Sequence, residues 1–179
     1  NSDASSRLMD SADHVFFAGD LNYRIELPRE RTEHTIRQIE RLKQQQTNQV
    51  TTHPEELEEQ IVNLFQELLK FDQLHRVMYA AGSNKDVSNA FPGFREGKIN
   101  FLPTFKFDKR SKEYDTSHKQ RIPSWTDRIL YKSRYDRGSS DSSDNGCSSG
   151  IISVLDYRSI PDAVHSDHRP VIGTYRIDF

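Results

Sequence analysis

Residues 119–130 read Lys-Gln-Arg-Ile-Pro-Ser-Trp-Thr-Asp-Arg-Ile-Leu, a basic and polar stretch that leads into the β-prone run of residues 127–132. Two other stretches are built in the same way. Gly-Asp-Leu-Asn-Tyr-Arg at residues 19–24 follows a short aromatic run, and Ser-Asp-His-Arg-Pro at residues 166–170 precedes an alternating run. Because a rigid scaffold can hold reactive groups in loops at strand ends, these three stretches are the candidate functional loops.

Two segments have helical periodicity. Ile36, Ile39 and Leu42 recur at helical spacing within residues 28–46. A second helix begins at the capping box of residues 52–55, with a Pro in its first turn. Its apolar residues lie on one face, which predicts a packing role rather than a catalytic one. They are Leu57, Ile61, Leu64, Phe65, Leu68 and Leu69.

Extended patterns predict the strands. The aromatic run at residues 14–18 is typical of a strand covered on both faces. Residues 171–179 alternate strictly between two faces. Residues 127–132 and 151–157 are further strand candidates, and residues 99–107 are β-prone although Pro103 limits their pairing. Helices and strands together predict a mixed α/β domain, with solvated loops near residues 44–52 and 138–150.

Composition excludes several classes of protein. The chain has 179 residues and a net charge of −2, so it has no global basic field for gripping nucleic acid. No apolar run approaches the ~18 residues that span a bilayer. The single cysteine, Cys147, excludes an internal disulfide framework and a cysteine-rich zinc site, and predicts a reducing, cytoplasmic compartment. Residue 1 is Asn rather than Met, which indicates a piece of a longer chain.

Two pairs of residues have the chemistry for hydrolysis at phosphorus. The Asp20 carboxylate can take a proton from water, and the Asn22 amide can hydrogen-bond a phosphoryl oxygen. Asp167 stands beside His168, whose imidazolium can stabilise negative charge on a phosphoryl group. Each pair alone is a weak signal, since Asp-x-Asn is common in turns and an Asp-His dipeptide is more often structural.

A basic segment adds a possible anion site. Residues 95–134 contain 11 Lys or Arg against 5 Asp or Glu, in a chain whose net charge is −2. This favours an anionic ligand recognised at one place, although a solvated surface strip is the commoner fate of such a run. Trp125, Tyr131 and Phe101 interleave with the charges and are expected to fill the core rather than to stack on bases.

The order of the motifs resembles the catalytic domain of the inositol polyphosphate 5-phosphatases, including the synaptojanin-like enzymes, within the deoxyribonuclease-I-like superfamily. The resemblance runs from about residue 13 to residue 175 and has apparent inserts near 44–52 and 138–150. The segments that carry it are Gly-Asp-Leu-Asn-Tyr-Arg at 19–24, Phe-Pro-Gly-Phe-Arg-Glu-Gly at 91–97, Pro-Thr-Phe-Lys-Phe-Asp at 103–108, Arg-Ile-Pro-Ser-Trp-Thr-Asp-Arg-Ile-Leu at 121–130 and Ser-Asp-His-Arg-Pro-Val at 166–171. The block at 121–130 is the most specific of these.

The resemblance implies a fold and a division of the chain. The family domain is a four-layer α/β/β/α sandwich about twice as long as this chain. Residues 13–179 would be its C-terminal half after a flexible start at residues 1–12, with the N-terminal half missing. That half carries a Glu that holds magnesium and a further catalytic His, so the chain alone is expected to be inactive.

The resemblance also implies an activity and roles for residues. The activity is magnesium-dependent removal of the 5-phosphate from soluble inositol polyphosphates or membrane phosphoinositides, by a cytoplasmic protein peripheral at membranes. Asp20 would activate the attacking water, and Asn22 and His168 would contact the scissile phosphate. Asp167 would orient His168 or bind the metal. Lys119 and Arg121, with Lys106 nearby, would bind the 4-phosphate, a site where the family often has Tyr in place of Phe105.

Two other functions stay open at this point. An endonuclease of the same superfamily, such as an abasic-site nuclease, would share the Asp20–Asn22 and Asp167–His168 pairs but would not need the block at residues 121–130. A non-catalytic module that binds phosphoinositides would keep only the basic pocket. The 5-phosphatase interpretation predicts an inositol phosphate partner and no nucleic acid.

Overall fold

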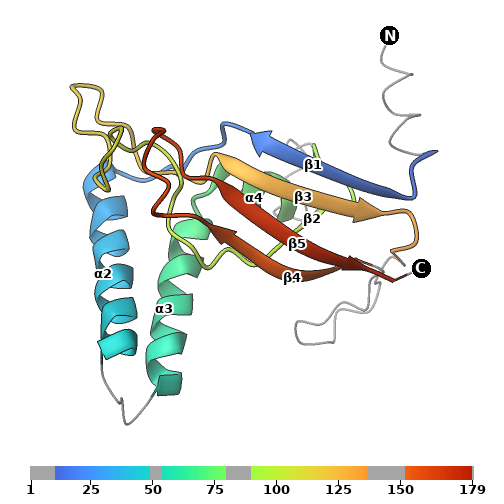
Figure 1. The fold of residues 1–179 in the computed structure, drawn as a ribbon, viewed down its shortest axis with the longest axis horizontal. Helices are drawn as coiled ribbons and strands as arrows, with labels where there is room; N and C mark the ends of the chain where they lie inside the picture. Colours follow the sequence, from blue (N-terminus) through green and yellow to red (C-terminus); the bar gives the residue numbers. More distant parts are fainter. Residues whose placement is uncertain (1–10, 49–53, 80–89, 137–151, 179) are drawn as a thin grey trace.

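The computed structural model describes residues 11–48, 54–79, 90–136 and 152–178. The helices are α2 (Arg29–Asn48), α3 (Pro54–Leu69) and α4 (Gln73–Tyr79). The strands are β1 (His14–Asp20), β2 (Arg95–Glu96), β3 (Asp127–Ser133), β4 (Ile152–Ser159) and β5 (Val171–Ile177). Figure 1 shows the strands side by side and the pair α2 and α3 beyond one end of them. The expected mixed α/β fold is confirmed.

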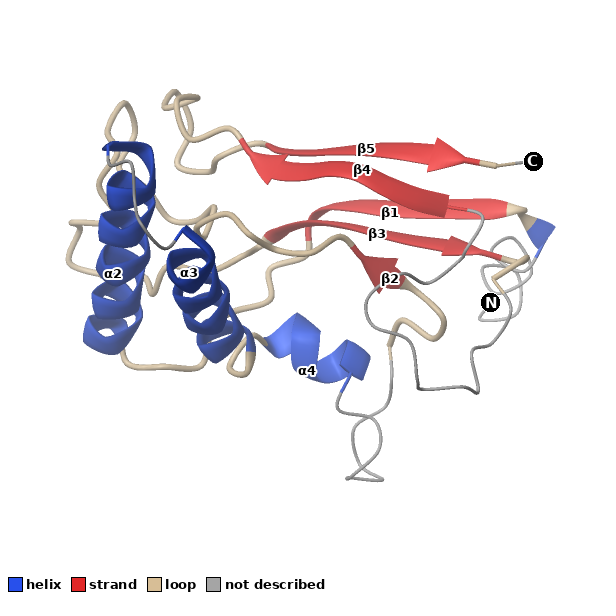
Figure 2. Ribbon diagram, turned by 90° about the horizontal axis from the view of Figure 1, so that it is seen from below, coloured by secondary structure: helices blue, strands red, loops and turns tan. Residues whose placement is uncertain are grey.

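The strands form two antiparallel sheets. One has the order β1-β3-β2, and the other is the pair β4-β5. Figure 2 shows these sheets as two stacked layers, with α4 on the far side of the three-stranded sheet. Tyr175 of β5 joins the layers, because its ring lies 4.9 Å from that of Phe16 and 5.3 Å from that of Tyr131. On the other face of the same sheet, Leu130 packs with Leu74 and Met78 of α4.

The prediction that residues 14–18 are covered on both faces is wrong. Phe16 is 42% exposed and Phe17 is 38% exposed. The reason is that β1 lies at the edge of its sheet and pairs only with β3 within the described residues. Phe16 therefore meets Tyr175 and Tyr131, and the ring of Phe17 lies 5.7 Å from that of Phe91.

One boundary also differs from expectation. The loop expected near residues 44–52 does not begin at residue 44, because α2 continues to Asn48, and residues 49–53 lie outside the described residues. The loop expected at 138–150 and most of the start at 1–12 also lie outside them. Residues 99–107 contain only isolated bridges, at Phe105 and Phe107, which agrees with the limit that Pro103 sets on pairing.

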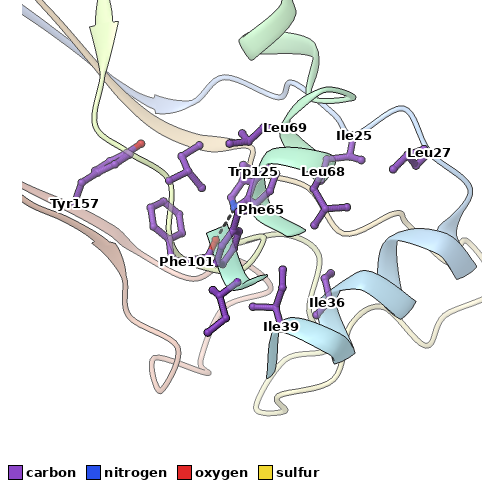
Figure 3. Close-up of a cluster of buried hydrophobic side chains, with 12 residues drawn as sticks. Ile25, Leu27, Ile36, Ile39, Phe65, Leu68, Leu69, Phe101, Trp125 and Tyr157 are labelled. Carbon is purple, nitrogen blue, oxygen red and sulfur yellow. Dashed lines mark hydrogen bonds between the residues drawn. The ribbon is translucent and has the colours of Figure 1, made fainter. Parts of the chain in front are cut away.

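The main core surrounds Trp125, which is fully buried (Figure 3). Its indole Nε1 donates a hydrogen bond to the Phe101 carbonyl oxygen at 2.9 Å. Buried residues from both long helices pack around it: Ile36, Ile39, Ile61, Phe65, Leu68 and Leu69. The expectations that α3 is a packing helix and that Trp125, Phe101 and Tyr131 are core residues are confirmed.

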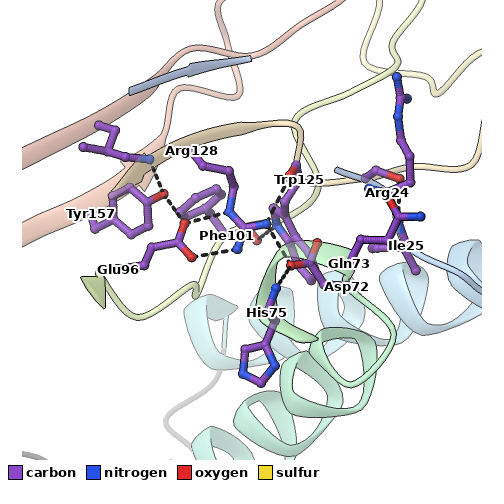
Figure 4. A network of polar contacts seen from close by, with 12 residues as sticks. Arg24, Ile25, Asp72, Gln73, His75, Glu96, Phe101, Trp125, Arg128 and Tyr157 are labelled. Atoms are coloured by element: carbon purple, nitrogen blue, oxygen red, sulfur yellow. Dashed lines mark hydrogen bonds and ion pairs between the residues drawn. The ribbon is translucent and has the colours of Figure 1, made fainter. Parts of the chain in front are cut away.

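A buried ion cluster joins β3 to β2 and to Asp72, the residue that precedes α4 (Figure 4). Arg128 Nη1 lies 2.9 Å from Asp72 Oδ2, and its Nε and Nη2 each lie 2.6 Å from a Glu96 carboxylate oxygen. The Tyr157 hydroxyl donates to Glu96 Oε1 at 2.7 Å. The side chains of Arg128 and Asp72 are fully buried. Neighbouring residues of a strand point to opposite faces. Because the cluster anchors Arg128 on one face of β3, residue 127 has to point to the other face.

None of the helices in the described ranges combines the length and the apolar character that a membrane span requires.

Candidate active site

The three polar stretches meet at one end of the sheets. Asp20, at the end of β1, lies opposite Asp127 at the start of β3. Phe105 forms isolated bridges both to Ser124, just before β3, and to His168, just before β5. The candidate residues of stretches 19–24, 119–130 and 166–170 therefore converge, although the first and the last stretch are more than a hundred positions apart along the chain.

His168 is held by a carboxylate. Its Nδ1 lies 2.9 Å from Asp127 Oδ2 and 3.1 Å from Asp127 Oδ1. Asp127 Oδ2 also accepts hydrogen bonds from the hydroxyls of Thr104 at 2.7 Å and Thr126 at 2.9 Å. An ionised carboxylate only accepts, so it keeps a proton on Nδ1, and Nε2 is the ring nitrogen that Asp127 does not bind.

The expectation that Asp167 orients His168 is wrong. The Asp167 main-chain oxygen accepts from the Phe107 N–H at 2.9 Å, and its carboxylate makes no hydrogen bond within the described ranges. The physical reason is the turn in which it lies. Buried Arg169 donates to the Ser166 carbonyl oxygen at 3.1 Å and to that of Ser111, which holds the turn so that the His168 ring reaches strand β3.

Asp127 is a candidate site residue that the sequence-based interpretation missed. Its signal was present, because it is the only acidic residue in the 121–130 block and it begins a predicted strand. The interpretation instead paired His168 with the Asp next to it in the sequence. The Phe105 ring completes the surroundings of His168, with 4.4 Å between the two ring centroids.

Asp20 and Asn22 form a tight turn. The Asn22 N–H donates to Asp20 Oδ1 at 2.9 Å, and Asn22 has a φ of 60°, a left-handed conformation that Asn tolerates better than most residues. The Leu21 N–H donates to the Thr126 carbonyl oxygen at 2.7 Å and so ties the turn to the residue before Asp127. Both Asp20 and Asn22 are exposed, as a site that receives a ligand from solvent requires.

The basic candidates share one anchor, the buried Asp115. Its Oδ2 accepts from the Arg121 main-chain N–H at 2.9 Å, and its own N–H donates to the Lys106 carbonyl oxygen at 2.9 Å. Its Oδ1 accepts from the Ser117 N–H at 3.1 Å. Burial raises the pKa of Asp115, but hydrogen bonds from Ser117 and the Arg121 N–H outweigh it, so that the pKa is about 2. The exposed Lys119 and Arg121 side chains thus belong to a loop held by an ionised carboxylate.

The described residues do not form a complete metal site. Within residues 11–48, 54–79, 90–136 and 152–178, no group of three or more His, Cys, Asp or Glu side chains could hold a metal ion. The expectation that Asp167 binds magnesium therefore stays a prediction.

A carboxylate-held imidazole next to an Asp–Asn turn, on a layered α/β scaffold, defines a candidate hydrolase. The chain belongs to the Endonuclease/Exonuclease/phosphatase family 2, whose model matches residues 2–174. It is 34% identical to rat synaptojanin-1 over 96% of its own length. It is 41% identical to human phosphatidylinositol polyphosphate 5-phosphatase type IV over 62% of its length. The resemblance to the 5-phosphatases is confirmed.

Solved structures agree on the fold. The inositol polyphosphate 5-phosphatase domain of SPsynaptojanin, in complex with inositol (1,4)-bisphosphate and calcium, matches 94% of this chain with a TM-score of 0.63 and 31% identity. A Cimex nitrophorin ferrous NO complex matches 94% of the chain with a TM-score of 0.61 and 28% identity. One scaffold thus serves proteins with unlike ligands, so function has to be argued from the site.

The chain spans only part of these relatives. It covers 10% of synaptojanin-1, 14% of the type IV 5-phosphatase and 37% of the SPsynaptojanin domain.

Proposed function

We propose that this chain supplies catalytic and substrate-binding residues for hydrolysis of the 5-phosphate of inositol polyphosphates or phosphoinositides. The observation that carries the proposal is the 2.9 Å contact between His168 and Asp127, beside the turn that contains Asp20 and Asn22. The names of the synaptojanin and 5-phosphatase relatives support the same substrate class.

In this reaction water attacks the 5-phosphorus atom, the ester P–O bond breaks, and the products are inorganic phosphate and an inositol hydroxyl. Asp20 takes a proton from the attacking water, a role that suits an exposed carboxylate at a strand end. Asn22 donates a hydrogen bond to a phosphoryl oxygen. His168, as an imidazolium whose Nδ1–H is bound by Asp127, uses Nε2–H to stabilise the charge that develops on the phosphoryl group.

Lys119 and Arg121, with Lys106 on the same Asp115-anchored loop, bind the neighbouring 4-phosphate. A guanidinium grips phosphate with two parallel hydrogen bonds, and an ammonium acts as a point charge. Phe105 has no hydroxyl to add to this set, so recognition of the 4-phosphate depends on the cations.

Magnesium dependence is part of the proposal. It is supported by the calcium ion in the SPsynaptojanin complex and by the carboxylate of Asp167, a hard oxygen ligand of the kind magnesium prefers. Since three ligands do not meet within the described residues, no step of the reaction is assigned to the ion. Because phosphoinositides are membrane lipids, we also infer that the protein acts in the cytoplasm, peripherally at membranes.

The test is an activity comparison on the full-length protein with magnesium. We expect phosphate release from inositol 1,4,5-trisphosphate and no cleavage of an abasic DNA duplex, with release lost in the isosteric variant Asp20→Asn. Cleavage of the duplex without phosphate release would assign the chain to the nucleases of the superfamily. Binding of the trisphosphate without release of phosphate would make it a non-catalytic phosphoinositide-binding module.

A further inference from the structure

Arg24 is a charged residue at the candidate site that the roles above leave unused. Its Nη2 donates to Oδ1 of Asn22, and its Nε donates to the Asn22 main-chain oxygen at 3.2 Å. Its guanidinium carbon lies 4.6 Å from the centroid of the Phe105 ring. Within the part of the chain that the structure describes, no carboxylate forms an ion pair with Arg24. Its partners are a neutral amide, a carbonyl and an aromatic ring.

The backbone at Arg24 is anchored independently of its side chain. The Arg24 N–H donates to Gln73 Oε1 at 2.9 Å, and Figure 4 shows the two residues side by side. The next residue, Ile25, is buried, and its N–H donates to Ser124 Oγ at 3.1 Å. A change confined to the guanidinium therefore leaves these main-chain contacts in place.

The contact with Asn22 has a chemical direction. A guanidinium has five N–H donors and no acceptor, so the amide atom that faces Arg24 has to be the oxygen. The Asn22 NH₂ group consequently points away from Arg24. The Asn22 N–H is held at the same time by Asp20 Oδ1 at 2.9 Å. Both ends of Asn22 are thus fixed, its backbone by Asp20 and its side chain by Arg24.

The surroundings of Arg24 are those of the site itself. The pKa of Arg24 is lowered overall. Burial and then the positive charge of Arg121 lower it, and the negative charges of Asp20 and Asp127 offset only part of this. The Phe105 ring beneath the guanidinium also contacts the His168 ring, 4.4 Å between centroids. Arg24 therefore lies between the Asn22 turn and the Phe105–His168 pair.

We propose that Arg24 is a positioning residue that holds the Asn22 amide with its NH₂ group toward the substrate. Resting on the proposed function, this assigns to Arg24 the orientation of the hydrogen-bond donor that meets the scissile phosphoryl group. If the amide were turned over, its carbonyl oxygen would face an anionic phosphate, and the contact would become repulsive.

The kinetic test uses the full-length protein and inositol 1,4,5-trisphosphate. Arg24→Met keeps the side-chain length but removes every donor, and we expect kcat to fall about 10–100-fold with KM changed less than about 3-fold, since loss of one donor in the transition state costs up to ~10²–10³. Arg24→Lys, which keeps a charge and one donor toward Oδ1, should recover part of this loss. Arg31→Met is the matched control, because Arg31 also lies over a ring, that of Phe71, at 5.8 Å.

A double-mutant cycle tests whether Arg24 acts through Asn22. In an Asn22→Ala background, Arg24→Met should cost less than about 2-fold further, because the amide that it orients is gone. Additive losses would overturn the proposal and mean that Arg24 contacts phosphate directly. Full activity of Arg24→Met would also overturn it. Absence of turnover in the wild type would instead count against the proposed function.

An NMR measurement, which does not depend on turnover, distinguishes orientation of the Asn22 amide by Arg24 from direct contact of Arg24 with phosphate. The Asn22 side-chain NH₂ signal in nitrogen-15 NMR is identified by its loss in Asn22→Ala. We expect it to shift on addition of inorganic phosphate in the wild type and in Arg31→Met, but not in Arg24→Met. A signal that shifts equally in Arg24→Met, or one that does not shift in the wild type, would overturn the proposal.

Discussion

The imidazole of His168 is bound by the carboxylate of Asp127, which lies 41 positions earlier in the chain, with 2.9 Å between Nδ1 and Oδ2. Asp127 in turn lies opposite Asp20 in the β1–β3 register. Asp127 therefore connects the candidate base, Asp20, with the candidate phosphate-binding imidazole of His168. This role explains why a polar residue begins strand β3, although the next residue, Arg128, is buried.

Replacing Asp127 by Asn should reduce kcat by about 10²–10³-fold, because a neutral amide no longer stabilises the imidazolium form of His168, the form that has N–H donors on both ring nitrogens. The measurement is steady-state phosphate release by the full-length protein. Asp156→Asn is the matched control, since the Asp156 side chain on β4 is 42% exposed and pairs with exposed Arg158. A near-normal kcat in Asp127→Asn would show that the reaction does not require the contact between Asp127 and His168.

Replacing Asp20 by Asn should abolish most turnover while substrate binding is largely retained. The new amide oxygen can still accept the Asn22 N–H, so the turn is kept, but the base is lost, at a typical cost of ~10²–10⁴ in rate. Single-turnover kinetics and calorimetric binding of the substrate check the two halves of this prediction. A variant that keeps its single-turnover rate would exclude Asp20 as the base.

Lys119→Ala and Arg121→Ala should weaken substrates that carry a 4-phosphate more than substrates that lack it. Each lost charge-assisted hydrogen bond should cost on the order of 1.5–3 kcal/mol in kcat/KM. Lys109→Ala serves as the control, because Lys109 is an exposed cation of the same basic segment that is not among the candidate residues. Equal losses for both substrate types would show that these cations do not recognise the 4-phosphate.

Asp115→Asn should lower stability and 4-phosphate recognition together, since Asp115 anchors the main chain of Arg121 and Lys106. The pKa of Asp115 is about 2, below the ordinary value near 3.8. Its stabilising contribution is therefore complete above about pH 4 and is lost as the pH falls toward 2. Urea midpoints should differ between wild type and variant at pH 6 and converge near pH 2. A difference that is independent of pH would contradict this role.

Arg128→Met should be the most destabilising of these changes, by about 3–5 kcal/mol, because it leaves the carboxylates of Asp72 and Glu96 buried without a cation. Arg158→Met, at an exposed pair with Asp156, should cost ~1 kcal/mol or less. The free energy of unfolding from urea titration gives both values. Comparable losses would mean that the buried cluster is not what holds β3 to β2 and to Asp72.

Local patterns were sufficient for much of the fold. The Pro that opens α3, its apolar face, and the strands near residues 127–132, 151–157 and 171–179 were predictable, because helical and strand periods are properties of neighbouring residues. The same patterns led to an error at residues 14–18. An aromatic run shows that a strand has apolar side chains, but burial depends on what lies beyond its edge, and β1 is at the edge of its sheet.

The sequence by itself determined which residues are candidates: the Asp20–Asn22 turn, the block at residues 121–130 and the stretch around His168. Only the tertiary structure decided how they are paired. Sequence proximity suggested Asp167 as the partner of His168, but successive residues of a turn point in different directions. The register of β1 on β3 places Asp127 opposite Asp20, and the bridges of Phe105 to Ser124 and to His168 bring the His168 ring to Asp127 instead. Such pairing depends on contacts between distant segments, which local periodicity does not encode.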